Sequence, residues 1–417
     1  MAELAKQLPS IANFFPLQSP ISSATRITED PLNIISSSST SSSPPTVLEI
    51  PKTLNAFDIA GHWSGKGQHV EFERRETIPL VQGKSLGRGA SADVDEVTCH
   101  GITLARKQIF CGRRMKIEDV KRELDILKKL SHKHVVTLVG SYVQSKTLGL
   151  LLYPAAVCDL GMYLDELDEE QRGEGEEVGE TMSRMLEQLR IPPTPEAARL
   201  RLKRAYGCIA NAVRYLHEND IRHKDLKPRN ILLDRSDGLF ITDFGISRDN
   251  TDASTSVTNG IERGTYKYCA PELAHFEPRG RAADVYSLGC VFLEIDTVYH
   301  GLSLVEFDEF RMKDGDHSFH GSQGKLKEWI KKIRAQQLGK EEALDVFGIL
   351  DITTKMIAEA PTERPTIGAI CSTLERLELL QHGISSYFSK CCRENIRARD
   401  EFEELRMLST PSLDLPY

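Results

Sequence analysis

The chain has 417 residues, of which 40% are hydrophobic and 27% charged, and its formal net charge is −8 at pH 7. This length predicts two or three folding units. The acidic balance argues against nucleic-acid binding, which needs a basic face. The longest apolar run, residues 148–157, is far shorter than the roughly 20 residues that span a bilayer.

The N-terminus lacks the charged start and apolar core of a secretory signal. The nine cysteines are odd in number, and none occurs in a C-x-x-C pair. Their spacing therefore predicts neither a zinc site nor a disulfide framework. Free thiols are typical of a reducing compartment, so we expect the cytoplasm, with the nucleus as the alternative.

Residues 1–74 are expected to form a largely disordered N-terminal segment. Its serine-rich tract at 36–45 cannot bury enough apolar surface to order itself. From about residue 75 the sequence changes to short segments rich in β-branched residues, separated by turns that contain glycine. This pattern predicts antiparallel strands over residues 77–86, 93–100, 102–110, 136–144 and 148–154.

Helical patterns lie between and after these strands. Apolar residues at positions 117, 120, 124 and 127 predict a helix over 116–130. The acidic insert at 165–180 contains nine acidic residues and one arginine, so we expect an exposed loop in which like charges repel. Residues 196–220 then predict one long amphipathic helix. Its expected inward face comprises Leu200, Ala205, Ile209, Ala212, Val213 and Leu216.

Two polar features stand out in the β-rich part. Gly87 and Gly89 lie between two predicted strands, where a turn can bring backbone N–H groups close to a phosphate. A simple hairpin accounts for such glycines more often. Lys107 lies inside an apolar strand; if it is buried it needs a charged partner, and Glu123 on the following helix offers one. The ordinary alternative is a lysine on a half-exposed strand.

The segment HKDLKPRN at 223–230 places Asp225, Lys227 and Asn230 within six residues. The simpler interpretation is a polar turn after a helix. However, Asp243 follows an apolar strand eighteen residues after Asp225 and precedes a glycine at position 245. Carboxylate and amide oxygens are suitable ligands for Mg²⁺ beside phosphates. A base, a cation and oxygen ligands for a metal are the groups that phosphoryl transfer needs.

Taken in order, these motifs resemble those of a eukaryotic protein kinase of the serine/threonine type over about residues 80–380. The resemblance matches the glycine-rich loop to 87–94, the strand lysine to Lys107 and the helix glutamate to Glu123. It matches the catalytic loop to 223–230 with Asp225 as the base, the metal-binding D-F-G to 243–245, and A-P-E to 270–272. It also implies that Asp284 anchors the catalytic loop and that Arg364 pairs with Glu272.

The resemblance implies an α+β, bilobal fold: a small β-rich N-lobe with one key helix and a larger, mainly helical C-lobe. The expected parts are the N-terminal segment (1–74), a kinase domain (75–382) with lobes at about 75–153 and 157–382, and a C-terminal tail (383–417). Between D-F-G and A-P-E, residues 251–258 offer hydroxyls whose phosphorylation would order the segment.

The same resemblance implies ATP and Mg²⁺ as cofactors, with Mn²⁺ as an alternative metal, and proteins with Ser or Thr acceptors as substrates. Asn230 and Asp243 would hold the metal. Leu152 would border the adenine site. The residues expected around ATP are Gly87, Arg88, Gly89, Ala90, Val94, Ala105, Lys107, Tyr153, Ala155 and Leu232. We expect no membrane span, and the sequence predicts no particular oligomeric state.

Three positions depart from the family's pattern. Ala92 replaces the third glycine of the loop, Lys224 replaces the arginine of H-R-D, and Arg106 precedes the strand lysine, where we expect its side chain to face solvent. None of these changes removes a catalytic group. The alternatives are a pseudokinase or scaffold that binds nucleotide or partner proteins without catalysis, and a phosphotransferase of small molecules. The first would lack one of the catalytic residues and the second would lack A-P-E.

Overall fold

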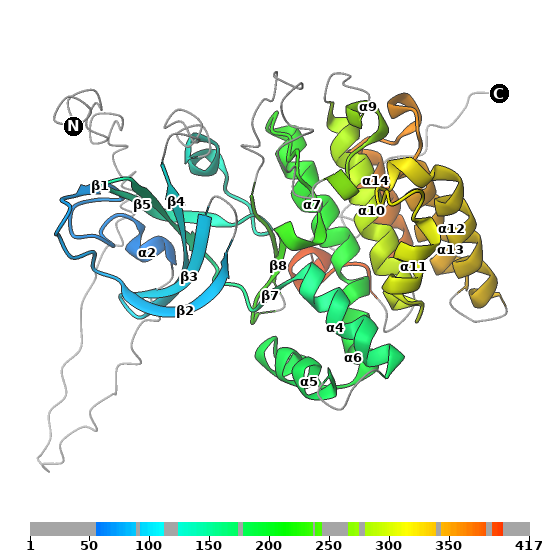
Figure 1. Cartoon of the computed structure of the whole chain (residues 1–417), viewed down its shortest axis with the longest axis horizontal. Helices are drawn as coiled ribbons and strands as arrows, with labels where there is room; N and C mark the ends of the chain where they lie inside the picture. Colours follow the sequence, from blue (N-terminus) through cyan, green and yellow to red (C-terminus); the bar gives the residue numbers. More distant parts are fainter. Residues whose placement is uncertain are drawn as a thin grey trace, which may run out of the picture.

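In the computed structural model, the chain forms a β-rich lobe followed by a mainly helical lobe, as Figure 1 shows from left to right. The structure describes residues 56–88, 92–111, 124–173, 178–236, 238–243, 266–274, 280–338, 343–380 and 386–394. The bilobal α+β fold is therefore confirmed. The hydroxyl-rich segment at 251–258 lies outside the described residues.

The small lobe is built on a six-stranded sheet with the order β1-β5-β6-β4-β3-β2. Its strands are β1 (His69–Phe72), β2 (Val81–Arg88), β3 (Ala92–Cys99), β4 (Ile102–Phe110), β5 (Thr137–Gln144) and β6 (Thr147–Tyr153). The last five agree with the strands predicted from sequence. In β4, Leu104, Ala105 and Ile109 are buried and Phe110 is exposed.

The sheet begins earlier in the chain than the sequence suggested. Helix α2 (Ala56–Ala60) and strand β1 belong to the small lobe, and β1 pairs in parallel with β5. Trp63 is fully buried between them, and its ring reaches within 2.2 Å of where a Cβ on Gly140 would lie. A side chain at Gly140 would therefore exclude the tryptophan. The expected boundary at residue 75 is too late, because burial of this aromatic ring stabilises the preceding residues against the sheet.

The helix expected at 116–130 is helical where it is described, at residues 124–129. Leu124 and Leu127 from its predicted apolar face are buried in the main core. Residues 112–123 lie outside the described part. A chain segment with Val135 and Val136 then leads into β5 and packs beside β9 of the large lobe.

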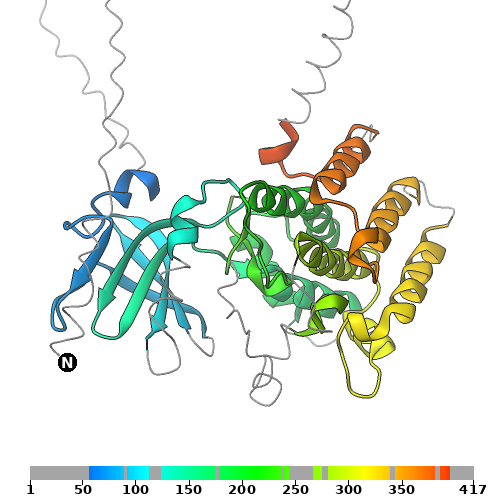
Figure 2. The ribbon, with the colours of Figure 1, turned by 90° about the horizontal axis from the view of Figure 1, so that it is seen from above.

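The large lobe packs helices around α10, which Figures 1 and 2 place at its centre. Its helices are α4 (Leu160–Arg172), α5 (Val178–Gln188), α6 (Pro195–Lys203), α7 (Ala205–Glu218), α9 (Pro271–Ala274), α10 (Arg281–Tyr299), α11 (Leu304–Arg311), α12 (Gln323–Gln337), α13 (Ala343–Met356) and α14 (Ile367–Leu380). Short 3₁₀ turns occur at η2 (Pro228–Asn230), η3 (His320–Ser322) and η4 (Pro361–Glu363).

A small sheet of β7 (Cys158–Asp159), β8 (Ile231–Leu233) and β9 (Leu239–Ile241) lies where the two lobes meet. Strands β8 and β9 form a hairpin that begins directly after η2. The hairpin therefore joins the segment around Asp225 to the segment that ends at Asp243, and it fixes the distance between them.

The acidic insert is not the exposed loop that its charge predicted. Most of the described part of 165–180 belongs to α4 and α5. Asp168 is buried, and it accepts a hydrogen bond from the backbone N–H of Leu304 at 2.9 Å and pairs with Arg172 at 3.2 Å. Its charge is therefore used to begin α11 and to pair within α4, so the segment is not repelled from the core.

The long helix predicted over 196–220 is broken at Arg204 into α6 and α7. The N–H of Gly207 donates to the carbonyl of Tyr387 at 3.0 Å instead of continuing the helical pattern. A Cβ at Gly207 would lie 2.2 Å from the Phe388 ring. The break thus accommodates the C-terminal segment 386–394. Leu200, which was expected on the inward face of the helix, is only half-buried.

The segment 386–394 packs on the large lobe, and Tyr387 and Phe388 are each 1% exposed. Glu378 of α14 accepts hydrogen bonds from the Ser386 hydroxyl at 2.7 Å and from the Tyr387 N–H at 2.8 Å. The domain boundary expected at residue 382 therefore separates two parts that are packed together. Among the described residues, no helix is both long and apolar enough to cross a membrane.

Candidate active site

Asp284, at the start of α10, holds the segment before Asp225 in place. Its carboxylate accepts hydrogen bonds from the N–H groups of His223 at 2.8 Å and Lys224 at 2.9 Å, and from the His217 ring at 2.9 Å. Burial alone would raise the pKa of Asp284, but the hydrogen bonds from the His217 ring and from the Lys224 N–H hold that pKa below its ordinary value. The expected anchoring contact is confirmed.

His223 connects this segment to the strand that leads to Asp243. Its fully buried ring donates from Nε2 to the carbonyl of Thr242 at 3.0 Å and accepts at Nδ1 from the N–H of Asp225 at 3.3 Å. This pattern requires the neutral ring. Burial lowers the pKa of His223, while nearby carboxylates oppose that shift, so the neutral form agrees with both observations.

Asp225, Lys227 and Asn230 form one connected group. The Lys227 ammonium lies 2.9 Å from Asp225 Oδ2. Asn230 Nδ2 donates to the Asp225 carbonyl at 2.7 Å and to Asp225 Oδ2 at 3.0 Å. Both hydrogen bonds use the amide nitrogen, so Oδ1 is the atom that Asn230 can offer to a cation. The arrangement places a carboxylate, an ammonium group and an amide oxygen side by side.

Asp243 and Lys107 come from different lobes and meet at 2.6 Å between Oδ1 and Nζ. Burial on its own would raise the pKa of Asp243, but the Lys107 ammonium holds that pKa below its ordinary value. Asp243 also has a backbone φ of +57°, in the left-handed region that non-glycine residues adopt infrequently. The Asp243 carboxylate is thus ionised, and its backbone has a left-handed conformation.

These donors fit Mg²⁺ and a polyphosphate. A carboxylate and an amide oxygen are the ligand types that Mg²⁺ takes in addition to phosphate oxygens. Lys107 and Lys227 place two ammonium groups beside them. The chain thus provides oxygen ligands for the metal and positive charge for the phosphates, both within one set of neighbouring residues.

Several expected site residues lie outside the described part of the chain. These are Glu123, Gly89, Ala90, and the Phe and Gly of D-F-G at positions 244 and 245. The pairing of Glu123 with Lys107 therefore stays a prediction. The described ends of the glycine-rich loop face each other across β2 and β3, where Gly87 pairs with Val94 and Arg88 pairs with Asp93.

The residues expected near adenine come from four strands and from the segment that follows β6. Ala105 of β4 pairs with Leu152 of β6, and both are buried. Val94, Ala155 and Leu232 are half-buried and pack against the same core, while Tyr153 at the end of β6 is 37% exposed. The arrangement supplies an apolar surface beside Lys107, and the particular adenine contacts of Tyr153 and Ala155 stay predictions.

Arg364 and Glu272 form a buried ion pair with two parallel hydrogen bonds, at 2.7 Å and 2.8 Å. Arg364 also donates to the carbonyls of Ala358, Ala282 and Glu359. The pair was expected from sequence and its contact is confirmed. It joins α9, at the end of the undescribed segment 244–265, to the turn before α14.

Two details differ from what the sequence suggested. Arg106 does not extend into solvent: its side chain is 13% exposed and pairs with Asp95 at 3.2 Å, because the neighbouring strands of the sheet carry matching polar groups. The sequence also does not single out His217, which binds Asp284. A histidine near a helix end resembles many others, and only its contact 67 residues away along the chain reveals its role.

Comparison with known families matches residues 80–374 to the family described as "Protein kinase domain". The chain belongs to the protein kinase family. Drosophila melanogaster "Serine/threonine-protein kinase fused" is 34% identical over 184 residues, which cover 44% of this chain and 19% of that protein. Two plant relatives align over more of the chain.

The "Receptor-like protein kinase" of Ipomoea nil is 27% identical over 333 residues, or 79% of this chain and 26% of that protein. The "Proline-rich receptor-like protein kinase PERK8" of Arabidopsis thaliana is 26% identical over 371 residues, or 83% of this chain and 49% of that protein. The kinase thus spans at most about half the length of these three relatives.

Proposed function

We propose that this kinase is an ATP-dependent serine/threonine protein kinase, which transfers the γ-phosphoryl group of ATP to Ser or Thr hydroxyls of proteins. The observation that carries the proposal is the connected group of Asp225, Lys227 and Asn230 beside the Lys107–Asp243 pair. All four groups that a pseudokinase commonly lacks (Lys107, Asp225, Asn230 and Asp243) are retained. This favours catalysis over the scaffold alternative.

ATP with Mg²⁺, when bound, supplies the phosphoryl group and neutralises part of its charge. Asn230 Oδ1 and the Asp243 carboxylate would hold the metal, with Mn²⁺ as an alternative ion. Lys107 would position the phosphates, and Ala105, Val94 and Leu232 would cover the adenine. We also propose that the kinase is located in the cytoplasm. All nine cysteines are free of disulfide bonds, which is typical of proteins in a reducing compartment.

Asp225 acts on the acceptor. Its carboxylate orients the substrate hydroxyl and accepts its proton as the oxygen–phosphorus bond forms. Lys227, 2.9 Å from that carboxylate, places positive charge where the transferred phosphoryl group gains negative charge. Lysine in this position of the loop is the pattern of the serine/threonine type, which supports Ser and Thr as the acceptors.

The test is incubation of the full chain with ATP labelled at the γ-phosphate, Mg²⁺ and casein as a generic protein substrate. We expect label on casein serine and threonine after acid hydrolysis, and none on tyrosine. ATP binding without any transfer to casein or to the kinase itself would support the scaffold alternative. Label on phosphotyrosine alone would refute the assignment of the acceptor.

A further inference from the structure

Four potential metal ligands, none of them among the candidate active-site residues, converge at one point. Nε2 of His134 and the Sγ atoms of Cys208, Cys391 and Cys392 all lie within 4.8 Å of one another. Nε2 is 3.1 Å from Cys392 Sγ and 3.4 Å from Cys391 Sγ, and the sulfurs of Cys208 and Cys391 are 3.9 Å apart. We refer to these four residues as the His134 cluster.

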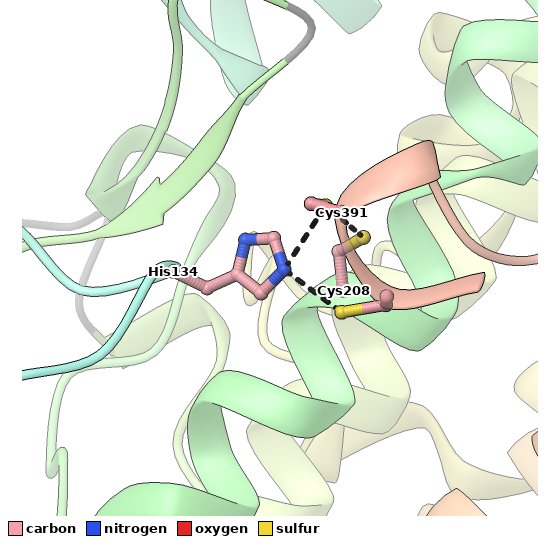
Figure 3. A group of neighbouring side chains, drawn as sticks. His134, Cys208 and Cys391 are labelled. Carbon is pink, nitrogen blue, oxygen red and sulfur yellow. Dashed lines mark hydrogen bonds between the residues drawn. The ribbon is translucent and has the colours of Figure 1, made fainter. Parts of the chain in front are cut away.

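The cluster joins three separate parts of the chain (Figure 3). His134 reaches in from the segment before β5, Cys208 comes from α7, and Cys391 comes from the C-terminal segment 386–394. Cys391 is exposed, whereas the other three residues are buried. Residues that lie 257 positions apart in sequence thus point their ligand atoms at a common centre.

The separations fit a tetrahedral ion. With zinc–sulfur bonds of about 2.3 Å and zinc–nitrogen bonds of about 2.0 Å, ligand atoms lie roughly 3.5–3.8 Å apart. The observed contacts of 3.1, 3.4 and 3.9 Å lie close to this range. A disulfide would require a sulfur–sulfur distance of about 2.0 Å, so Cys208 and Cys391 are not bonded to each other.

The surroundings prepare the ligand atoms for a metal. His134 donates from Nδ1 to the carbonyl of Leu239 at 2.8 Å, which leaves the lone pair of Nε2 directed at the sulfurs; metal-bound histidines are held in this way. The Asn211 amide donates to Cys392 Sγ and the Ser389 N–H donates to Cys208 Sγ, both at 3.4 Å. N–H groups directed at sulfur stabilise thiolates.

The charge balance is also favourable. Three thiolates and one neutral imidazole around Zn²⁺ give a net charge of −1. The Lys133 ammonium donates to the carbonyl of Cys391, so a positive charge lies beside the site. Cysteine and histidine in the ratio of three to one form a closed structural zinc site, which leaves no position for substrate.

We propose that His134, Cys208, Cys391 and Cys392 bind one structural Zn²⁺ ion, which fastens the segment 386–394 to the kinase domain. Two of the ligands lie inside the matched residues 80–374 and two lie beyond them. The carbonyl of His134 also accepts a hydrogen bond from the N–H of Ile241 at 2.9 Å. The metal therefore holds the tail against the strand that precedes Asp243.

The direct test is metal analysis of the full chain, purified in reducing buffer without chelators. We expect about one zinc ion per chain, as one closed four-ligand site requires. Cys391→Ser changes the exposed ligand and should lower the zinc content at least fivefold. Cys111→Ser, a half-buried cysteine of the small lobe, is the matched control and should retain the full content.

A second measurement does not depend on whether a variant folds. The wild-type chain, freed of metal under reducing conditions, is titrated with Co²⁺, whose tetrahedral thiolate complexes absorb strongly in the visible range. We expect this absorption to saturate at one equivalent and to be abolished by stoichiometric Zn²⁺. Lys107→Met should leave the titration unchanged, because the site is separate from phosphoryl transfer.

Three results would overturn the proposal. The first is wild-type protein with neither zinc nor a Co²⁺ thiolate spectrum. The second is a disulfide that involves Cys208, Cys391 or Cys392 in protein isolated under reducing conditions. The third is equal loss of metal from the Cys391→Ser and Cys111→Ser variants.

Discussion

At the scale of single residues, the contact that matters most is the one between Lys107 and Asp243. These residues are 136 positions apart, and their ammonium and carboxylate groups meet at 2.6 Å. The proximity keeps Asp243 ionised, since the nearby positive charge lowers its pKa against the effect of burial. The proposed metal ligand therefore stays charged, and the lysine proposed to bind phosphate lies beside it.

Removal of this ammonium group should abolish most of the activity. For Lys107→Met we expect kcat/KM for ATP to fall by about 10²-fold or more, since a positioned charge at a transferring phosphoryl group contributes several kcal/mol. Steady-state kinetics with a peptide substrate measures the effect. The control is Lys84→Met, which changes an exposed lysine of β2 and should leave kcat/KM unchanged. Equal rates for Lys107→Met and wild type would exclude Lys107 from the site.

The sequence predicts which polar residues come together at the candidate site, because their chemistry and their order along the chain are both distinctive. Asp225, Asn230 and Asp243 are examples. It predicts the supporting residues poorly. His217 binds Asp284 from the preceding helix, and nothing in its local sequence distinguishes it from any other helical histidine.

At the scale of elements, the buried pair of Glu272 and Arg364 joins α9 to the turn before α14. Glu272→Gln leaves the guanidinium buried without its countercharge. We expect this change to lower the free energy of unfolding by about 3–5 kcal/mol, as is usual when one partner of a buried ion pair is removed. Chemical denaturation measures the difference.

The matched control for that variant is Glu306→Gln. Glu306 pairs with Lys332 at 3.4 Å on the surface, and exposed pairs contribute about 0–1 kcal/mol. A loss of similar size in both variants would show that the Glu272–Arg364 pair does not stabilise the large lobe through burial of its charges.

The packing of α7 on α10 makes stability depend on pH. Asp296 is buried against the Tyr206 hydroxyl, and burial raises its pKa to about 7. Between about pH 4 and pH 7 the unfolded chain releases this proton while the folded chain keeps it, so stability falls as pH rises. The loss is at most about 1.4 kcal/mol per pH unit and levels off above the folded pKa.

Asp296→Asn should remove this dependence, because the amide oxygen still accepts from Tyr206 and carries no charge. We expect the stability of the variant relative to wild type to increase by about 2 kcal/mol between pH 5 and pH 7 and then to stay constant. Urea denaturation at several pH values measures this. Parallel curves for the two proteins would refute a raised pKa at Asp296.

The two errors of secondary structure have physical causes outside the local sequence. Leu160, Tyr163, Leu164 and Leu167 have helical spacing and are buried in α4, but the density of acidic residues after them suggested a loop. The break at Arg204 accommodates Tyr387 and Phe388. No pattern within 196–220 indicates that a distant segment packs there.

At the scale of the whole molecule, the sequence predicts the two lobes and their order, because strand and helix patterns are local. It does not predict that residues 56–72 complete the small lobe or that 386–394 packs on the large one. It does not predict the His134 cluster either, for the same reason. Its four residues come from three distant segments. A search for C-x-x-C pairs finds only cysteines that are close in sequence, so it cannot detect a cluster of this kind.

The central claim is that Asp225 serves as the base in phosphoryl transfer to a protein hydroxyl. The most direct test is single-turnover transfer from γ-labelled ATP by wild type, Asp225→Asn and Asp220→Asn, with ATP affinity measured in parallel. Asp220 is an exposed carboxylate five residues before Asp225, so Asp220→Asn should match wild type. For Asp225→Asn we predict a rate lower by about 10²-fold or more, with ATP affinity unchanged. Transfer by Asp225→Asn at the wild-type rate would contradict the account.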